Sequence, residues 1–226
     1  MPEHCVLCMH EAIWERMPQR AGVELLYNLK STLGKHPVYR VIVNGRPIAV
    51  AHPGLGAPLA VGLTEEIIAK GARKLIATGS CGVLDATIRR GSPILVTSSL
   101  RDEGTSFHYQ PPSRFVQASP QAMEAIRAEL LDAGLPLHEA KAWTTDAFYR
   151  ETPEKIQRRR EEGCQVVEME TSALFALGRF RQVTIGALLW AADDVTGTAW
   201  NSRNDHDIVV SPERLFEAAL AACLRL

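Results

Sequence analysis

Residues 165–194 read QVVEMETSALFALGRFRQVTIGALLWAADD. The pattern predicts a short strand over 165–168, a helix over about 170–180 and a central strand over 183–192, where an apolar run carries no charge. A strand, a helix of about a dozen residues and a second strand form a βαβ unit. We therefore expect an α/β protein with a largely parallel sheet that binds its ligand at the carboxyl ends of the strands.

The same alternation of strands and helices extends over the rest of the chain. Asn44-Gly45 separates two β-branched runs and predicts a tight hairpin, whereas residues 79–82 (GSCG) are expected to form a loop. No repeat, linker or low-complexity tract divides the chain, so residues 1–226 are predicted to form a single domain. Further strands are expected at 5–8, 38–43, 47–52, 74–78, 92–100 and 137–144, and further helices at 21–31, 59–70, 119–134, 153–162 and 212–225.

The composition excludes several function classes. The 226 residues include 25 Lys and Arg against 26 Asp and Glu, and the formal charge of −1 argues against a basic nucleic-acid-binding face. The apolar run at residues 183–192 is far shorter than the roughly 20 residues that a bilayer requires. No charged and then apolar leader is seen, so we expect a cytoplasmic protein that binds neither nucleic acid nor membrane.

The cysteines and histidines give little support for a metal site. Cys5 and Cys8 form a CxxC motif that two histidines flank, but the motif lies in an apolar strand, where reduced cysteine is usually a small buried hydrophobe. Residues 205–207 (Asp-His-Asp) lie in a polar segment and are expected to form a loop or a cap. No metal is predicted.

Polar and aromatic residues follow several predicted strands. Taken singly, each has a structural explanation: the glycines of PGLGAP (53–58) allow a tight turn, Glu168 and Glu170 suit a helix N-terminus, and Asp193-Asp194 suits a turn. Taken together, the three acids Glu168, Glu170 and Asp193 would meet Phe148 and Ser80 in one crevice. Such a crevice suits a polar sugar beside a flat base.

The order of these motifs resembles the nucleoside phosphorylase and nucleosidase superfamily, in the branch that contains bacterial purine nucleoside phosphorylase, uridine phosphorylase and methylthioadenosine nucleosidase. The resemblance covers residues 45–200 and implies a three-layer α/β/α sandwich around a mixed, partly barrel-like sheet. It also implies a homo-oligomer that uses no cofactor, with phosphate as a candidate co-substrate. The matching segments are GLGAP, GSCGVL, GSPILVTSSLRDEG, TDAFY, VVEMETSALFAL and a strand ending in ADD.

The resemblance also implies roles for single residues. Met169 would pack against the ribose and Glu170 would accept hydrogen bonds from its hydroxyls, with Glu168 beside them. Phe148 would stack on the base. Asp193 would protonate the ring nitrogen of a purine, and such proton transfer contributes about 10²–10⁴ in rate.

Three arginines that build the phosphate site of this branch are missing. Their positions fall near Trp14, at Gly34 and at Ala77. A charge-assisted hydrogen bond contributes about 1.5–3 kcal/mol, so the loss removes roughly 5–9 kcal/mol of phosphate affinity. Substitute cations could come from Lys35, Arg40 or Arg101.

The residues that remain near the expected phosphate position would bind an anion weakly and could equally hold a water molecule. Ser80, with backbone amides at Gly56 and Gly79, could hold phosphate, whereas Glu11 or Glu15 could hold a water molecule as nucleosidases do. Of the two candidate histidines, His108 is better placed than His4 to reach a site.

Three functions therefore stay open. Hydrolysis of a nucleoside, with a purine favoured by Asp193, is slightly preferred. Phosphorolysis of a purine nucleoside or of uridine with an atypical phosphate site is the first alternative. A nucleoside-binding protein that has lost catalysis is the second.

Overall fold

The computed structural model describes residues 1–197, 199–204 and 207–226, so two residues of the Asp-His-Asp cluster at 205–207 lie outside the described residues. No helix in these ranges is long and apolar enough to span a bilayer. The strands are β1 (His4–Cys8), β2 (Glu24–Ser31), β3 (Gly34–Val43), β4 (Arg46–Ala51), β5 (Lys74–Thr78), β6 (Ser80–Val83), β7 (Pro93–Asp102), β8 (Phe115–Gln117), β9 (His138–Thr145), β10 (Cys164–Glu168) and β11 (Thr184–Asp194). The α-helices are α1 (Glu11–Arg16), α2 (Ala57–Ala69), α3 (Pro120–Asp132), α4 (Pro153–Glu161), α5 (Thr171–Arg181) and α6 (Pro212–Leu224), with 3-10 turns η1 (Met17–Gln19), η2 (Thr105–His108) and η3 (Phe148–Arg150).

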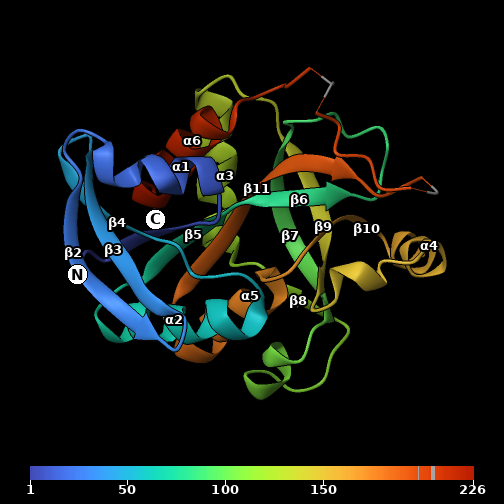
Figure 1. Cartoon of the computed structure of the whole chain (residues 1–226), viewed down its shortest axis with the longest axis horizontal. Coiled ribbons are helices and arrows are strands. Elements are labelled where there is room, and N and C mark those ends of the chain that lie inside the picture. Colours follow the sequence, from blue (N-terminus) through green and yellow to red (C-terminus); the bar gives the residue numbers. More distant parts are fainter. Residues whose placement is uncertain (198, 205–206) are drawn as a thin grey trace.

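The strands form one mixed sheet that is open at one end and closed at the other. Its order is β2-β3-β4-β1-β5-β11-β6-β10-β9-β7-β8, and an additional pairing of β11 with β7 closes the last part into a barrel (Figure 1). β11 pairs with β5 near Thr184, with β7 near Leu189 and with β6 near Trp190. This strand therefore belongs to both parts of the sheet.

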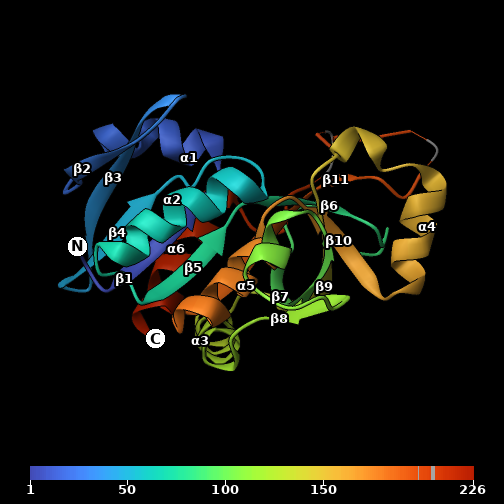
Figure 2. The same cartoon turned by 90° about the horizontal axis from the view of Figure 1, so that it is seen from below.

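Helices cover both faces of the open part, as expected for an α/β/α sandwich. Figure 2 shows α2 and α5 together on the side that faces the viewer, whereas α3 and α6 pack on each other and on the opposite face of the sheet. α4 lies beside the barrel, at the end far from the β2–β3–β4 hairpins (Figure 1). The three-layer architecture and the barrel-like sheet predicted from the resemblance are confirmed.

The two sheet faces support separate apolar cores. Cys5 packs with the core under α2 and α5, and Cys8 packs with the core under α3 and α6. Both thiols are buried, and burial raises the pKa of Cys8 to about 12. Because their side chains lie on opposite faces of β1, these two cysteines cannot share a metal ion or a disulfide.

The helix predicted at residues 21–31 is wrong, because β2 pairs antiparallel with β3 there. The pairing register shifts between Leu25 and Tyr27, as at a β-bulge. The extra residue, Leu26, and the next, Tyr27, both pack against the core. The bulge breaks the alternation that identifies a strand and leaves apolar residues at helical spacing.

The predicted loop at residues 79–82 is also wrong in part, since residues from Ser80 onward form β6. This short strand runs parallel to β11 and antiparallel to β10 inside the barrel. The other predicted strands and helices are confirmed within a few residues, and the Asn44-Gly45 hairpin has the positive φ angles of 50° and 75° that its turn requires.

Gly186 allows β11 to lie against α3, and its replacement tests that contact. A Cβ atom at Gly186 would lie 2.6 Å from the Cβ atom of Ala122, so Gly186→Ala is expected to lower the free energy of unfolding by about 1–3 kcal/mol in urea denaturation. Gly62→Ala, where the new Cβ meets no atom within 4 Å, is the control and is expected to stabilise α2 by about 0.5–1 kcal/mol. Equal stabilities for the two variants would contradict the close approach of β11 and α3.

Candidate active site

Two cavities meet at the carboxyl ends of β5, β10 and β11. The larger has a volume of about 640 Å³ and the smaller about 290 Å³. Ser80 and Glu168 line both, so the two cavities adjoin and together make up one hollow. Its size suits two joined groups, one in each cavity.

Aromatic side chains form one wall of the larger cavity. Phe148 is 46% exposed and its ring centroid lies 4.2 Å from that of Tyr149. Trp200 and Met169 also line this cavity. The rings of this wall offer apolar faces on which an aromatic ligand could stack.

Asp193 lies at the end of β11 and is half-buried in the larger cavity. Its Oδ2 accepts a hydrogen bond of 2.7 Å from the indole nitrogen of Trp200. Gly82 makes room for this carboxyl, because a Cβ atom there would lie 3.3 Å from Oδ2. The next residue, Asp194, instead accepts the backbone N–H of Thr196 with its Oδ1.

Glu168 connects β10, β9 and the start of α5. Its Oε2 accepts the backbone N–H groups of Glu170 and Thr171 at 2.7 and 2.6 Å, and its Oε1 accepts the hydroxyl of Thr144. Burial raises the pKa of Glu168, while these donors oppose the rise. Because every partner donates, we assign the ionised form to this carboxyl.

Glu170 reaches across to the loop before α2. Its Oε1 accepts the backbone N–H of Gly56 at 2.6 Å, and the side chain is only 5% exposed. Burial, together with the nearby charge of Glu168, raises the pKa of Glu170 to about 8. Near neutral pH, therefore, Glu170 holds the proton of this pair of carboxyl groups.

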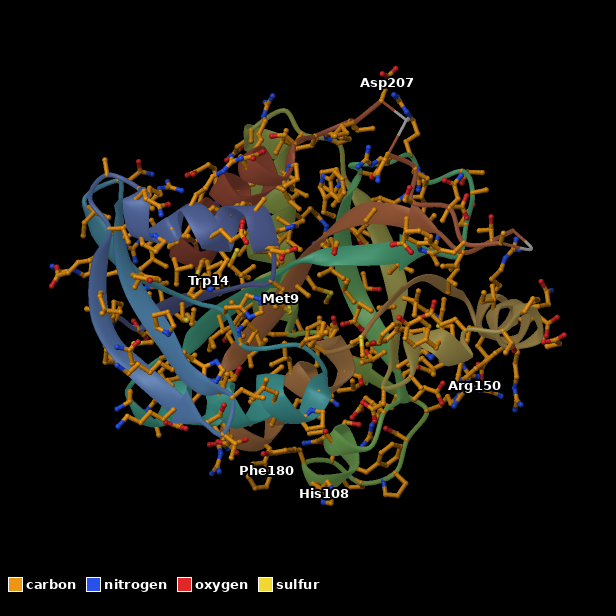
Figure 3. All side chains as sticks on the ribbon, viewed as in Figure 1. Met9, Trp14, His108, Arg150, Phe180 and Asp207 are labelled. Carbon is orange, nitrogen blue, oxygen red and sulfur yellow. The ribbon has the colours of Figure 1, made fainter. Side chains whose placement is uncertain are left out.

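The smaller cavity is acidic and aromatic. Glu11, Trp14 and His52 line it with Glu170, and Figure 3 shows Trp14 beside Met9, another lining residue. No lysine or arginine from the described part of the chain contributes to this lining.

His52 is neutral and its ring orientation is fixed. Its Nδ1 accepts the backbone N–H of Gly54, so its proton is on Nε2, and the ring lies edge-on to Trp14 with centroids 5.6 Å apart. Burial lowers the pKa of His52, with a smaller effect from His36.

The predicted substitute cations lie elsewhere. Arg40 pairs with Glu24 on the outer hairpin, and Lys35 lies at the start of β3. Arg101 is buried, donates to Ser106 and to the carbonyl of Pro111, and thereby holds the loop after β7.

The predicted phosphate-or-water residues are only partly brought together. Glu11, Gly79 and Ser80 line the smaller cavity, whereas the amide of Gly56 is used by Glu170. Ala77, at an expected arginine position, is buried inside β5.

The remaining candidates lie outside both cavities. Glu15 is exposed and His4 is buried in β1. His108 lies at the outer edge near Phe180 (Figure 3). Among the described residues, no three or more His, Cys, Asp and Glu side chains gather as a metal ion would require.

Among the lining residues that the sequence analysis did not single out are one histidine, one acid and one tryptophan: His52, Glu151 and Trp200. His52 directly follows β4, and this strand-end position was the available signal. Glu151 and Trp200 lie in irregular segments, where no periodicity indicates direction. Burial and the charge of Asp193 raise the pKa of Glu151 to about 7.

Residues 15–225 match the family described as the phosphorylase superfamily. The chain belongs to that superfamily. It is 25% identical over 154 residues to the guanosine phosphorylase of Halorubrum lacusprofundi, and the alignment covers 68% of this chain and 64% of that protein. It is 26% identical over 173 residues to the DeoD-type purine nucleoside phosphorylase of Bacillus cytotoxicus, and the alignment covers 74% of this chain and 71% of that protein.

Solved members of the phosphorylase superfamily share the whole fold. The purine nucleoside phosphorylase of Toxoplasma gondii in complex with immucillin-H superposes with a TM-score of 0.82 at 21% identity, over 100% of this chain and 92% of that one. The uridine phosphorylase of Vibrio fischeri gives 0.78 at 23% identity over the same shares. The predicted family is confirmed, and it is one of enzymes that cleave the N-glycosidic bond of nucleosides.

The raised pKa of Glu170 predicts how stability depends on pH. A carboxyl whose pKa is higher in the folded than in the unfolded state stabilises the fold fully below the unfolded pKa of about 4.5, and this contribution is lost as the pH rises through about 8. Relative to Glu170→Gln, which stays neutral, the wild type should lose about 1–3 kcal/mol of unfolding free energy between about pH 5 and 8.5.

Urea denaturation across this pH range measures the difference. Glu15→Gln, at an exposed acid outside the cavities, is the control and should track the wild type at every pH. A constant difference between Glu170→Gln and the wild type would show that the folded protein does not raise the pKa of Glu170.

Proposed function

We propose that this protein hydrolyses the N-glycosidic bond of a purine nucleoside. The observation that carries the proposal is the composition of the smaller cavity, which adjoins Glu170 and is lined by acids, His52 and Trp14 but by no lysine or arginine of the described residues. A nucleoside would place its base in the larger cavity and its ribose at the junction of the two cavities. The attacking group would then come from the smaller cavity.

The larger cavity supports binding and protonation of the base. Phe148 offers a face for stacking, and Asp193 lines the same cavity. As the glycosidic bond breaks, electrons move onto the base, and a proton delivered by a carboxylic acid neutralises them. In this proposal Asp193 delivers that proton to a ring nitrogen and exchanges its hydrogen bond with Trp200 for one with the base.

The junction supports binding of the sugar. Protonated Glu170 can donate to one ribose hydroxyl and accept from another, and Met169 packs against the ring. The ionised Glu168 lies next to this position, where its negative charge favours a sugar that becomes cationic in the transition state.

The smaller cavity supports activation of water. Glu11 can accept a proton from a water molecule, whereas His52, with its proton on Nε2, can donate a hydrogen bond to the same molecule. A phosphate dianion in this cavity would face the carboxylates of Glu11 and Glu168 without a described cation, and its binding would be opposed by their charge.

Phosphorolysis is the second candidate, because the relatives named above are phosphorylases. The third function left open by the sequence, binding without catalysis, would leave no use for the acid at Asp193. Homo-oligomeric assembly and a cytoplasmic location stay predictions, as do the roles of single residues in binding and catalysis.

Release of free base with and without phosphate tests the reaction type. We expect purine nucleosides to be cleaved to free base and free ribose in phosphate-free buffer. Added phosphate should change the rate by less than about twofold, because no lysine or arginine of the described residues lines the smaller cavity. Chromatography of the products distinguishes ribose from ribose 1-phosphate. Formation of ribose 1-phosphate, or a strict need for phosphate, would overturn the hydrolytic assignment.

The role of Asp193 is tested with its neighbour as control. Asp193→Asn is expected to lower kcat for base release by about 10²–10⁴ while ligand affinity stays within about tenfold, since the amide cannot donate a proton as an acid does. Asp194→Asn keeps an oxygen for the N–H of Thr196 and should retain wild-type activity. Equal turnover of Asp193→Asn and the wild type would remove Asp193 from the mechanism.

A further inference from the structure

We infer that Glu151 is a second base-contacting residue, which selects purines that carry an exocyclic amino group. The inference rests on the proposed function, because it assumes that the base lies in the larger cavity. Glu151 and Asp193 line that cavity together, one from the segment before α4 and the other from the end of β11. The base end of the cavity thus has two carboxyl groups.

The backbone holds Glu151 next to the stacking residue. Its N–H donates to the carbonyl oxygen of Phe148 at 3.2 Å, which closes the η3 turn. Two residues later Pro153 begins α4, with the side chain of Thr152 as its cap. Because Phe148 and Glu151 belong to one turn and both line the larger cavity, a base stacked on Phe148 would lie in the cavity that Glu151 faces.

Among the described residues, the carboxyl of Glu151 has no hydrogen-bond or ion-pair partner that would explain its position. It accepts no hydrogen bond and forms no ion pair with any other described residue. Lys155, one turn further along α4, donates instead to Asp102 at 2.9 Å, and Arg159 donates to the same carboxylate at 3.0 Å. A partly buried carboxyl that faces a cavity and leaves the nearby Lys155 to another acid is available for a ligand.

The groups around Glu151 place the ionisation of its carboxyl near neutral pH. Asp193 on β11 repels its negative charge and Lys155 on α4 attracts it, while Tyr149 and Glu168 also face the cavity. Burial and Asp193 raise the pKa of Glu151 to about 7, so Glu151 becomes ionised as the pH rises through neutrality. Its ionised carboxylate can then accept a hydrogen bond from a ligand.

This combination matches a particular base edge. An aminopurine such as adenine has an N–H donor next to a ring nitrogen that accepts, so ionised Glu151 would accept from the amino group while Asp193 protonates the nitrogen. A purine without the amino group would leave the carboxylate of Glu151 covered by the base and without a hydrogen-bond donor. Sites that hydrogen-bond one substrate group discriminate strongly against analogues that lack it.

The test compares adenosine with purine riboside, which lacks only the amino group. We expect the ratio of their kcat/KM values to fall at least about tenfold in Glu151→Ala, whereas Glu154→Ala, one turn away and exposed on α4, leaves it unchanged. In the wild type the ratio should rise between about pH 6 and about pH 8, as Glu151 ionises, and in Glu151→Ala this rise should be absent.

A binding measurement separates this inference from the proposed hydrolysis. Calorimetry with free adenine and free purine should show a preference for adenine that Glu151→Ala loses. If the wild type releases no base and yet shows that preference, the proposed reaction fails and the role of Glu151 stands. If the variant keeps both the kinetic ratio and the binding preference within about threefold of the wild type, the role of Glu151 is overturned.

Discussion

The candidate site depends on the hydrogen bonds that the carboxylate of Glu168 accepts. This carboxylate accepts the first amides of α5 and the hydroxyl of Thr144, which in turn accepts the amide of Ser172. These bonds hold the end of β10 against β9 and fix the turn from which Met169 and Glu170 project. Without them, nothing would direct Glu170 across the sheet to the amide of Gly56. A buried charge of this kind persists because each of its oxygens is matched by donors.

The second constraint is the path of β11. Its first residues complete the open sheet, whereas its last residues belong to the barrel. The strand therefore carries Asp193 beyond the sheet to the same hollow that Glu168 borders. Because Gly82 has no side chain, the carboxyl of Asp193 can lie inside the mouth of the barrel. Distant segments of the chain thus meet because one strand is shared, and not because a loop folds back.

The sequence predicted those features that depend on regular patterns. The strand, helix and strand over residues 165–194, the Asn44-Gly45 hairpin and the strand-end acids all follow from periodicity and turn chemistry. The parallel pairing expected of a βαβ unit there is wrong, because β6 lies between the two strands, parallel to β11 and antiparallel to β10. The sequence could not predict β2, because a bulge at Leu26 disguises the alternation. Nor could it place Glu151 and Trp200, since their side chains are directed by a 3-10 turn and by a loop after β11. An irregular segment has no repeating pattern from which the direction of a side chain could be predicted.

The proposed chemistry requires that the two cavities together hold one nucleoside, with its sugar at their junction. A crystal structure with a purine C-nucleoside, whose carbon–carbon glycosidic bond resists cleavage, shows directly whether they do. We predict the base between Phe148 and Asp193, the ribose hydroxyls on Glu170 and an ordered water near Glu11. A ligand bound with its base in the smaller cavity, or outside both cavities, would contradict the proposal.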